Sequence, residues 1–250
     1  MSELVLSLFP GIGLLDMAFE EAGFCVVRGP DVLWGGDIKR FSPPAGRFGG
    51  VIGGPPCQAF SVFRHILIAK GIPLKENLIP EFERCVTEAQ PRWFLMENVT
   101  EAPEPAIADY GVISLLLNNR WVGGTQNRVR RFSFGVRGTL CALSAYIDYE
   151  LFEPIEFEYA VTASRGSMSG LKKDRGGISR PKRTLERRDR AGRRTVAECA
   201  VLQGLPADFL SDAPFTRDGR HRAIGNGVPL PMGRAIANAV KAAIGAMSCP

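Results

Sequence analysis

The first thirty residues place an apolar run, a glycine turn and an amphipathic segment in a fixed order, and this order constrains the fold most. Residues 4–9, LVLSLF, predict a buried strand, and the turn PGIG follows it. Apolar side chains then recur at helical spacing until Gly23, which is suited to end a helix. Residues 24–27 predict a second strand. A strand, a helix and a strand in succession favour parallel pairing, so we expect a parallel β-sheet with helices packed on its faces.

The same alternation continues along the chain. We expect strands at 50–52 and 92–96, helices at 78–90, 113–118, 195–202 and 232–247, and a closing hairpin formed by Trp121-Val122 and 132–136. The pattern predicts a doubly wound α/β fold. We expect three segments, namely a catalytic and cofactor-binding domain at 1–137, a basic insert at 138–194 and a C-terminal part at 195–250 that returns to the first domain.

The positive charge of the chain is concentrated in one segment. The net charge is +5, yet residues 164–194 alone hold twelve Lys or Arg against three Asp or Glu. Such a segment either binds a polyanion such as nucleic acid or is a solvated charge run. Composition alone leaves both readings open.

Other sequence features argue against several classes of protein. The six cysteines form no CxxC pair, and two histidines are too few for a His-rich metal site. We expect no metal, no disulfide framework and an intracellular, reducing location. No apolar run is long enough to span a membrane, and the first residues do not resemble a signal peptide.

The stretch GGPPCQAFS, residues 53–61, fixes its backbone around one thiol. Two prolines lock their own φ angles and push each preceding residue towards extended geometry. We expect Cys57 on a rigid loop at the carboxyl end of the 50–52 strand, where open α/β sheets carry their chemistry. Cys57 is either a nucleophile or an inert buried thiol.

Other polar groups follow predicted strands. FPGIG at 9–13 allows close backbone approach to a cofactor, and Asp31, Trp34 and Asp37 are suited to a ribose, a purine face and its exocyclic amine. An ordinary surface turn explains the same residues equally well.

Two further groups carry candidate chemistry. Glu97 follows a buried strand and is either a proton donor with a raised pKa, a helix N-cap or half of a salt bridge. Gln126, Arg128 and Arg130 alternate at strand spacing and so share one face, which suits either a site or a solvated edge strand.

The order of these motifs resembles the DNA (cytosine-5)-methyltransferase family. The resemblance runs from residue 4 to about residue 240, apart from the basic insert, and rests on six motifs in sequence: FxGxG, GGPPCQxFS, ENV, QxRxR, RTVAECAVLQGLP and AIGNGVP. It implies a Rossmann-like fold that depends on S-adenosyl-L-methionine and releases S-adenosyl-L-homocysteine.

The resemblance implies a role for each catalytic residue. Cys57 attacks C6 of a flipped-out cytosine, and Glu97 bonds N3 and the exocyclic amine. Arg130 holds the cytosine O2, while Arg128 and Gln126 support Cys57 and the backbone of the target nucleotide. Residues with implied cofactor contacts are Phe9, Gly11, Ile12, Gly13, Asp31, Trp34, Asp37, Ile38, Pro55, Asn226 and Val228.

The implied partner is double-stranded DNA. Residues expected at the DNA are Gln58, Ser61, Arg165, Lys172, Lys173, Arg175, Arg180 and Lys182. The stretch between QNRVRR and RRTVAE is short for a target-recognition region, so we expect short or relaxed sequence specificity. The segment from Asp31 to Asp37 is also shorter than in relatives.

Several alternatives stay open at this stage. The same machinery suits RNA (tRNA) cytosine methylation, and a catalytically inactive DNA-binding relative with a regulatory role is a further reading. A cysteine hydrolase is disfavoured because neither His65 nor His221 lies in a partner motif. The resemblance implies a cytoplasmic monomer from a bacterium, phage or mobile element, with a possible cognate restriction endonuclease.

Overall fold

The computed structural model describes residues 3–56, 60, 76–150, 157–162 and 194–247. These residues form two compact units. Unit 1 comprises 1–117, 129–148 and 233–250, and unit 2 comprises 118–128 and 149–232. Residues 195–232, which belong to the expected C-terminal part, group with unit 2.

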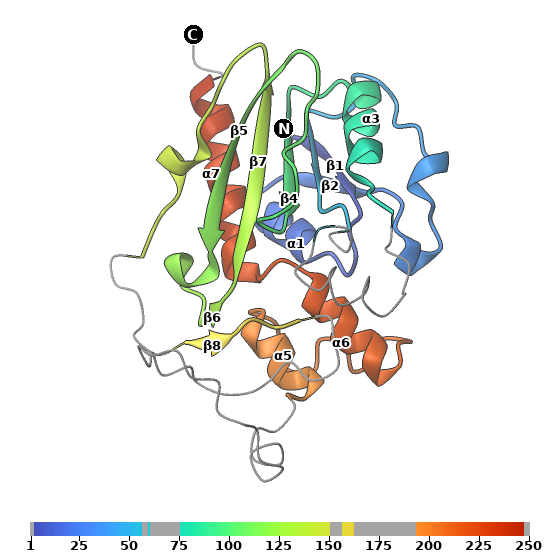
Figure 1. Ribbon diagram of the computed structural model, residues 1–250, viewed down its shortest axis with the longest axis vertical. Helices are drawn as coiled ribbons and strands as arrows, with labels where there is room; N and C mark the ends of the chain where they lie inside the picture. The colour runs from blue at the N-terminus through green and yellow to red at the C-terminus, as the bar shows by residue number, and fades with distance from the viewer. Residues whose placement is uncertain (1–2, 57–59, 61–75, 151–156, 163–193, 248–250) are drawn as a thin grey trace. The chain divides into compact units, whose positions relative to one another are not determined.

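Unit 1 contains the main β-sheet (Figure 1). The described strands are β1 (Leu4–Leu8), β2 (Cys25–Arg28), β3 (Gly50–Gly53), β4 (Trp93–Asn98), β5 (Tyr110–Asn118, whose last residue falls in unit 2) and β7 (Val129–Arg137). Within the described residues these six strands form one sheet in the order β2-β1-β3-β4-β7-β5. The first four are parallel, and β7 runs antiparallel to β4. This is the predicted doubly wound arrangement, closed by an antiparallel strand.

Helices cover both faces of this sheet. Its described helices are α1 (Leu14–Glu21), α3 (Ile79–Ala89) and α7 (Leu230–Met247, from Gly233 in unit 1), with short 3₁₀ helices η1 (Val32–Trp34), η2 (Ile38–Arg40) and η5 (Leu143–Tyr146). The α7 helix packs beside α1, where Lys241 Nζ donates to the Ala22 carbonyl at 2.7 Å. The α3 helix lies on the opposite face and buries Phe82.

Two neighbouring aromatic residues of β4 fill the core on opposite faces of the sheet. Trp93 stacks on Phe19 of α1, with ring centroids 6.2 Å apart. Phe94 packs edge-on against Phe82 of α3, with centroids 5.9 Å apart. Successive strand residues point to opposite faces, so this pair anchors a helix layer on each side of β4.

Unit 2 is built around a small sheet and two helices. Its elements are β6 (Gln126–Asn127), β8 (Glu158–Tyr159), η4 (Asn119–Val122), α5 (Val196–Leu202) and α6 (Arg217–Asn226). The β6 and β8 strands pair in parallel. A reciprocal capping box between Thr195 and Glu198 begins α5. The predicted helix at 195–202 is therefore confirmed.

Two local predictions are wrong. Residues 113–118 form strand β5 instead of a helix, because hydrogen bonding beside β7 overrides the local pattern. Trp121 and Val122 lie in η4, so the strand beside β7 is β5. Among the described residues, no helix is long and apolar enough to cross a membrane.

Candidate active site

The strand register brings two loops and the end of β4 together at one edge of the sheet. Leu8 of β1 pairs with Gly53 of β3, and Gly53 pairs with Met96 of β4. These residues lie at or near the carboxyl ends of parallel strands, so the glycine loop, the GGPP loop and Glu97 follow side by side. The chain turns outwards from β1 to β2 and then inwards to β3, which makes this edge the topological switch point of the sheet.

The loop after β1 has an unusual backbone held by two side chains. Phe9, Gly11 and Gly13 have φ angles of 56°, 57° and 81°. Asp31 accepts a hydrogen bond from the Gly11 amide at 2.9 Å, and Trp34 Nε1 donates to the Gly11 carbonyl at 2.7 Å. The structure therefore brings Asp31 and Trp34 to the glycine loop, as a shared site requires. These two bonds exclude the alternative that Asp31 and Trp34 belong to a surface turn with no connection to the glycine loop.

This corner of unit 1 suits a nucleoside. A Cβ added at Gly11 would meet no atom within 4 Å, so there is open space against the loop. The Trp34 side chain is 59% exposed and offers an aromatic face. The Asp31 carboxylate accepts from the Gly11 and Leu33 amides, and the Asp37 carboxylate accepts from the Lys39 amide. Each carboxylate oxygen has two lone pairs, so both groups keep capacity for a further donor. The residues present therefore fit an adenosine-containing cofactor.

A buried carboxylate supports the glycine loop from beneath. Asp16 in the first turn of α1 accepts from Ser7 Oγ at 2.5 Å and from Arg28 Nε at 2.9 Å. Burial raises the pKa of Asp16, while the bonds from Ser7 and Arg28 oppose that rise. The Arg28 guanidinium also lies across Gly13, because a Cβ added there would come within 2.6 Å of Arg28 Nη2.

Glu97 lies inside the β4 strand, one residue before its end, and is buried. Its carboxylate lies 3.0 Å from Arg130 Nε. A Cβ added at Gly54 would come within 3.1 Å of Glu97 Oε2, so the glycine lets the GGPP loop lie against the carboxyl group. The amide of Asn98 donates to the Pro55 carbonyl at 3.1 Å and fixes that loop from the next position.

Cys57 directly follows this described geometry but lies outside the described residues. The residues predicted to contact DNA also lie outside the described residues, namely Gln58, Ser61, Arg165, Lys172, Lys173, Arg175, Arg180 and Lys182.

Gln126 and Arg128 belong to unit 2, whereas Arg130 belongs to unit 1. Gln126 is fully buried, donating to the Leu202 carbonyl at 2.6 Å and accepting from the Val161 amide at 3.0 Å. Arg128 donates to three backbone carbonyls, those of Val161, Gly225 and Gly227. A solvated edge strand is therefore the wrong description of these two residues. Their geometry favours positioning over contact with a nucleotide.

The Arg128 contacts fix the turn that contains the predicted cofactor residues Asn226 and Val228. Asn226 is the exposed last residue of α6, and Val228 is buried. The first half of the AIGNGVP motif is helical, because α6 extends to Asn226.

One cysteine does contact a histidine. Cys199 Sγ lies 3.8 Å from His221 Nδ1, and both side chains are buried in unit 2. Burial raises the pKa of Cys199 and lowers that of His221. Both shifts favour the neutral forms, so this pair lacks the thiolate that a hydrolase needs. Within the part of the chain that the structure describes, no group of three or more His, Cys, Asp or Glu is arranged to hold a metal ion.

Three supporting residues were missed by sequence reasoning, namely Asp16, Arg84 and Asn98. Asn98 belongs to the ENV motif, and Arg84 lies at helical spacing between Glu81 and Glu88, so each carried a local signal. Their long-range backbone contacts follow only from the packed fold.

The fold and this edge of the sheet define a class, the doubly wound α/β proteins that bind a nucleotide-like cofactor at the switch point. Comparison with known proteins identifies the family. The model of the C-5 cytosine-specific DNA methylase family matches residues 35–162, and the chain belongs to that family.

Individual relatives agree with this assignment. The chain is 32% identical over 179 residues to the type II methyltransferase M.FnuDI of Fusobacterium nucleatum, which covers 60% of this chain and 51% of that protein. It is 24% identical to the type II methyltransferase M.HgiDI of Herpetosiphon aurantiacus over an alignment of 312 positions, which covers 95% of this chain and 94% of that protein. The chain thus spans only about half the length of M.FnuDI.

Solved structures share the fold. A DNA modification methyltransferase encoded within a prophage of E. coli superposes with a TM-score of 0.63 at 20% identity, covering 98% of this chain and all of that one.

Proposed function

We propose that this chain transfers a methyl group from S-adenosyl-L-methionine to C5 of cytosine in DNA. The observation that carries the proposal is the Glu97–Arg130 pair, 3.0 Å apart, beside Gly54 of the loop that leads directly to Cys57. Family membership supports the reaction class, and the glycine loop with Asp31 and Trp34 supports the cofactor.

The proposed reaction begins with addition to the base. The Cys57 thiolate forms a bond to C6, and the electron pair of the C5–C6 double bond makes C5 nucleophilic. Glu97 bonds N3 and the exocyclic amine, stabilising the charge that develops on the ring during addition. Arg130 keeps Glu97 in place and holds the O2 atom of the base. When bound, S-adenosyl-L-methionine would supply the electrophilic methyl group for C5 and would become S-adenosyl-L-homocysteine.

The reaction ends with elimination. C5 loses its proton to solvent base, the electron pair restores the double bond, and the Cys57–C6 bond breaks to return the thiolate. In a duplex, stacking covers the ring face at which C6 and C5 react and base pairing occupies N3, so the cytosine is flipped out of the duplex at a cost of roughly a few kcal/mol.

The remaining assignments belong to the same proposal. Phe9, Ile12 and Gly13 border the methionine part of the cofactor, Asp31 the ribose and Trp34 the adenine face. Pro55 of unit 1, and Asn226 and Val228 of unit 2, are the further residues proposed to contact the cofactor. Residues 138–194 form the target-recognition region between the catalytic segments. The protein acts in the cytoplasm as a monomer, and a cognate restriction endonuclease is a proposed partner.

Labelled methyl transfer tests this function directly. Duplex DNA and tRNA are each incubated with radiolabelled S-adenosyl-L-methionine and either the wild-type protein or a Cys57→Ala variant. We expect label in the DNA only, at C5 of cytosine after nucleoside digestion, and none with the variant. Label in tRNA but not in DNA would transfer the proposal to RNA methylation. Equal labelling by the Cys57→Ala variant would overturn it.

A second test concerns sequence specificity. The recognition segment is short and basic, which suits phosphate contacts better than extensive base readout. Bisulfite sequencing of DNA methylated by the protein should reveal a context of about two to four bases, in keeping with the few base contacts that such a segment supplies. A unique site of six or more base pairs would contradict this expectation.

A further inference from the structure

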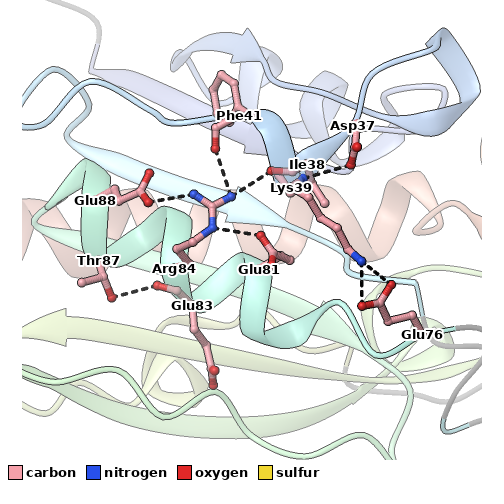
Figure 2. Close-up of polar contacts among 10 residues, drawn as sticks. All are labelled: Asp37, Ile38, Lys39, Phe41, Glu76, Glu81, Glu83, Arg84, Thr87 and Glu88. Atoms are coloured by element: carbon pink, nitrogen blue, oxygen red, sulfur yellow. Dashed lines mark hydrogen bonds and ion pairs between the residues drawn. The ribbon is translucent and has the colours of Figure 1, made fainter.

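The planar guanidinium group of Arg84 on α3 donates four hydrogen bonds (Figure 2). Nε donates to Glu81 at 2.9 Å and Nη1 donates to Glu88 at 2.8 Å. Nη2 donates to the backbone carbonyls of Ile38 at 2.8 Å and Phe41 at 3.0 Å. Two carboxylates on its own helix therefore orient Arg84, and its Nη2 atom bonds another segment of unit 1.

That other segment contains the predicted contact for the adenine edge. Asp37 begins η2 by accepting from the Lys39 amide at 3.0 Å, and Ile38 is buried. A 3₁₀ turn of three residues is weakly held by its own hydrogen bonds. The chain from Asp31 to Asp37 is also short and lies on the surface, so η2 depends on outside contacts for its position.

The ion pair that η2 makes with Glu76 is more exposed than the Arg84 contacts. Lys39 pairs with Glu76 at 2.6 Å, but both side chains are about half exposed, so water screens this pair. Arg84 is more enclosed, with 31% of its side chain exposed, and it bonds carbonyl groups whose position is fixed by the backbone. Ile38 also packs in the core cluster that contains Phe82 of α3, and the Arg84 bonds are the polar link from η2 to that helix.

We propose that Arg84 is a positioning residue for cofactor recognition, which holds Asp37 and Ile38 where they read the amino edge of the adenine ring. This inference rests on the proposed function, because it assumes that S-adenosyl-L-methionine binds along the glycine loop and η2. It predicts that loss of the guanidinium fork lowers discrimination for adenine specifically, while the fold and the other contacts to the cofactor remain.

The decisive variant is Arg84→Lys. Lysine keeps a positive charge between Glu81 and Glu88 but cannot present the planar fork that reaches both carbonyls. Arg84→Met removes the charge as well. Arg92→Met is the matched control, because Arg92 pairs with Glu3 on the surface at the amino end of β4, away from the site.

The readout is binding by calorimetry of S-adenosyl-L-homocysteine and of its inosine counterpart, which lacks the exocyclic amine. We expect wild-type protein and Arg92→Met to prefer the adenine compound. Arg84→Lys should bind that compound about tenfold more weakly, as loss of charge-assisted hydrogen bonds implies, with little change for the inosine compound. Asp37→Asn should lose the same preference. Thermal unfolding checks that each variant is folded.

Methyl-transfer kinetics give a second readout. The KM for S-adenosyl-L-methionine should rise in Arg84→Lys while kcat changes little, because the reacting groups at Glu97 are untouched. A folded Arg84→Lys variant that retains wild-type preference for adenine would overturn the inference and leave the proposed function intact. Wild-type protein that binds neither compound would overturn both.

Discussion

At the scale of single residues, Glu97 and Arg130 form the ion pair on which the proposed chemistry rests. The β4 and β7 strands pair antiparallel, with Glu97 opposite Phe132. Arg130 lies two residues before Phe132 in β7, so its side chain is on the same face of the sheet as that of Glu97. The ion pair is nearly enclosed, with 11% of the Glu97 side chain and 19% of the Arg130 side chain exposed. Such a pair keeps the carboxyl group in one orientation beside the GGPP loop.

Glu97→Gln tests the role of this carboxyl group. The amide preserves the size of the side chain but has no acidic proton to donate to N3 as negative charge develops on the ring during addition. We expect methyl transfer to fall by about 10² to 10⁴-fold, the usual range for loss of a catalytic acid or base, while cofactor affinity stays within a few-fold. Glu21→Gln is the matched control, since Glu21 forms a surface ion pair with Arg234. Retention of more than about a tenth of the activity would contradict the assignment.

His221 gives a prediction for stability against pH. Burial lowers the pKa of His221, with a further lowering from Arg217 and an opposing effect from Asp218. The unfolded chain then binds this proton more readily than the folded chain. The unfolding free energy should therefore be highest above the ordinary pKa of 6.5 and fall as the pH drops towards the lowered value.

Chemical denaturation at several pH values measures this effect. His221→Asn should show a flatter decline below pH 6.5 than wild-type protein. The other histidine, His65, is present in both proteins and cancels in the comparison. Identical pH profiles would show that His221 is not the group responsible.

The sequence reveals some of these residues and hides others for a physical reason. Glu97 and Arg130 stand in short motifs, so their types and spacing were sufficient to select them. Asp31 and Trp34 were also selected, but as direct ligands of a cofactor. Their bonds to the Gly11 peptide group depend on how β1 and β2 lie side by side, which no local pattern encodes.

At the scale of elements, β4 organises unit 1 through two aromatic rings and two glycines. Gly50 of β3 pairs with Trp93, and Gly135 of β7 pairs with Phe94. Each ring lies across the backbone of its glycine partner, since an added Cβ would come within 2.1 Å of Trp93 or 2.2 Å of Phe94. The missing side chains on the neighbouring strands make room for the large rings of the central one.

Gly135→Ala tests this packing. The added methyl group forces the Phe94 ring to move within a close-packed core, so we expect a loss of about 1–3 kcal/mol in unfolding free energy. Gly245→Ala is the control, because a Cβ at this position of α7 would meet no atom within 4 Å. That control should be neutral or slightly stabilising, since alanine favours a helix. Denaturant titration distinguishes the two; an unchanged midpoint for Gly135→Ala would refute the packing argument.

The elements that were predicted correctly have strong local signals. The α3 helix has a clear apolar face, and α5 begins with a capping box. The β5 strand was predicted as a helix because its apolar run, VISLLL, suits either state. Its place beside β7 decided the outcome, and that neighbour lies outside any local window.

At the scale of the whole molecule, the chain passes between the two units at residues 117–118, 128–129, 148–149 and 232–233. The QxRxR motif spans one of these passages, so Gln126 and Arg128 stabilise unit 2 while Arg130 contacts Glu97 in unit 1. Alternation along a sequence indicated a shared strand face. It could not indicate that the motif divides between two compact units.

The covalent step at Cys57 is the central claim, and one measurement tests it most directly. Duplex DNA containing 2′-deoxy-5-fluorocytidine is incubated with the protein and S-adenosyl-L-methionine, then denatured and digested for mass spectrometry. After methyl transfer, fluorine at C5 cannot leave as a proton would, so the bond between the enzyme and C6 persists. The account predicts a denaturant-stable protein–DNA complex with the modified base on Cys57, absent in Cys57→Ala. Methylation of ordinary DNA without such a complex, or an adduct at another residue, would contradict it.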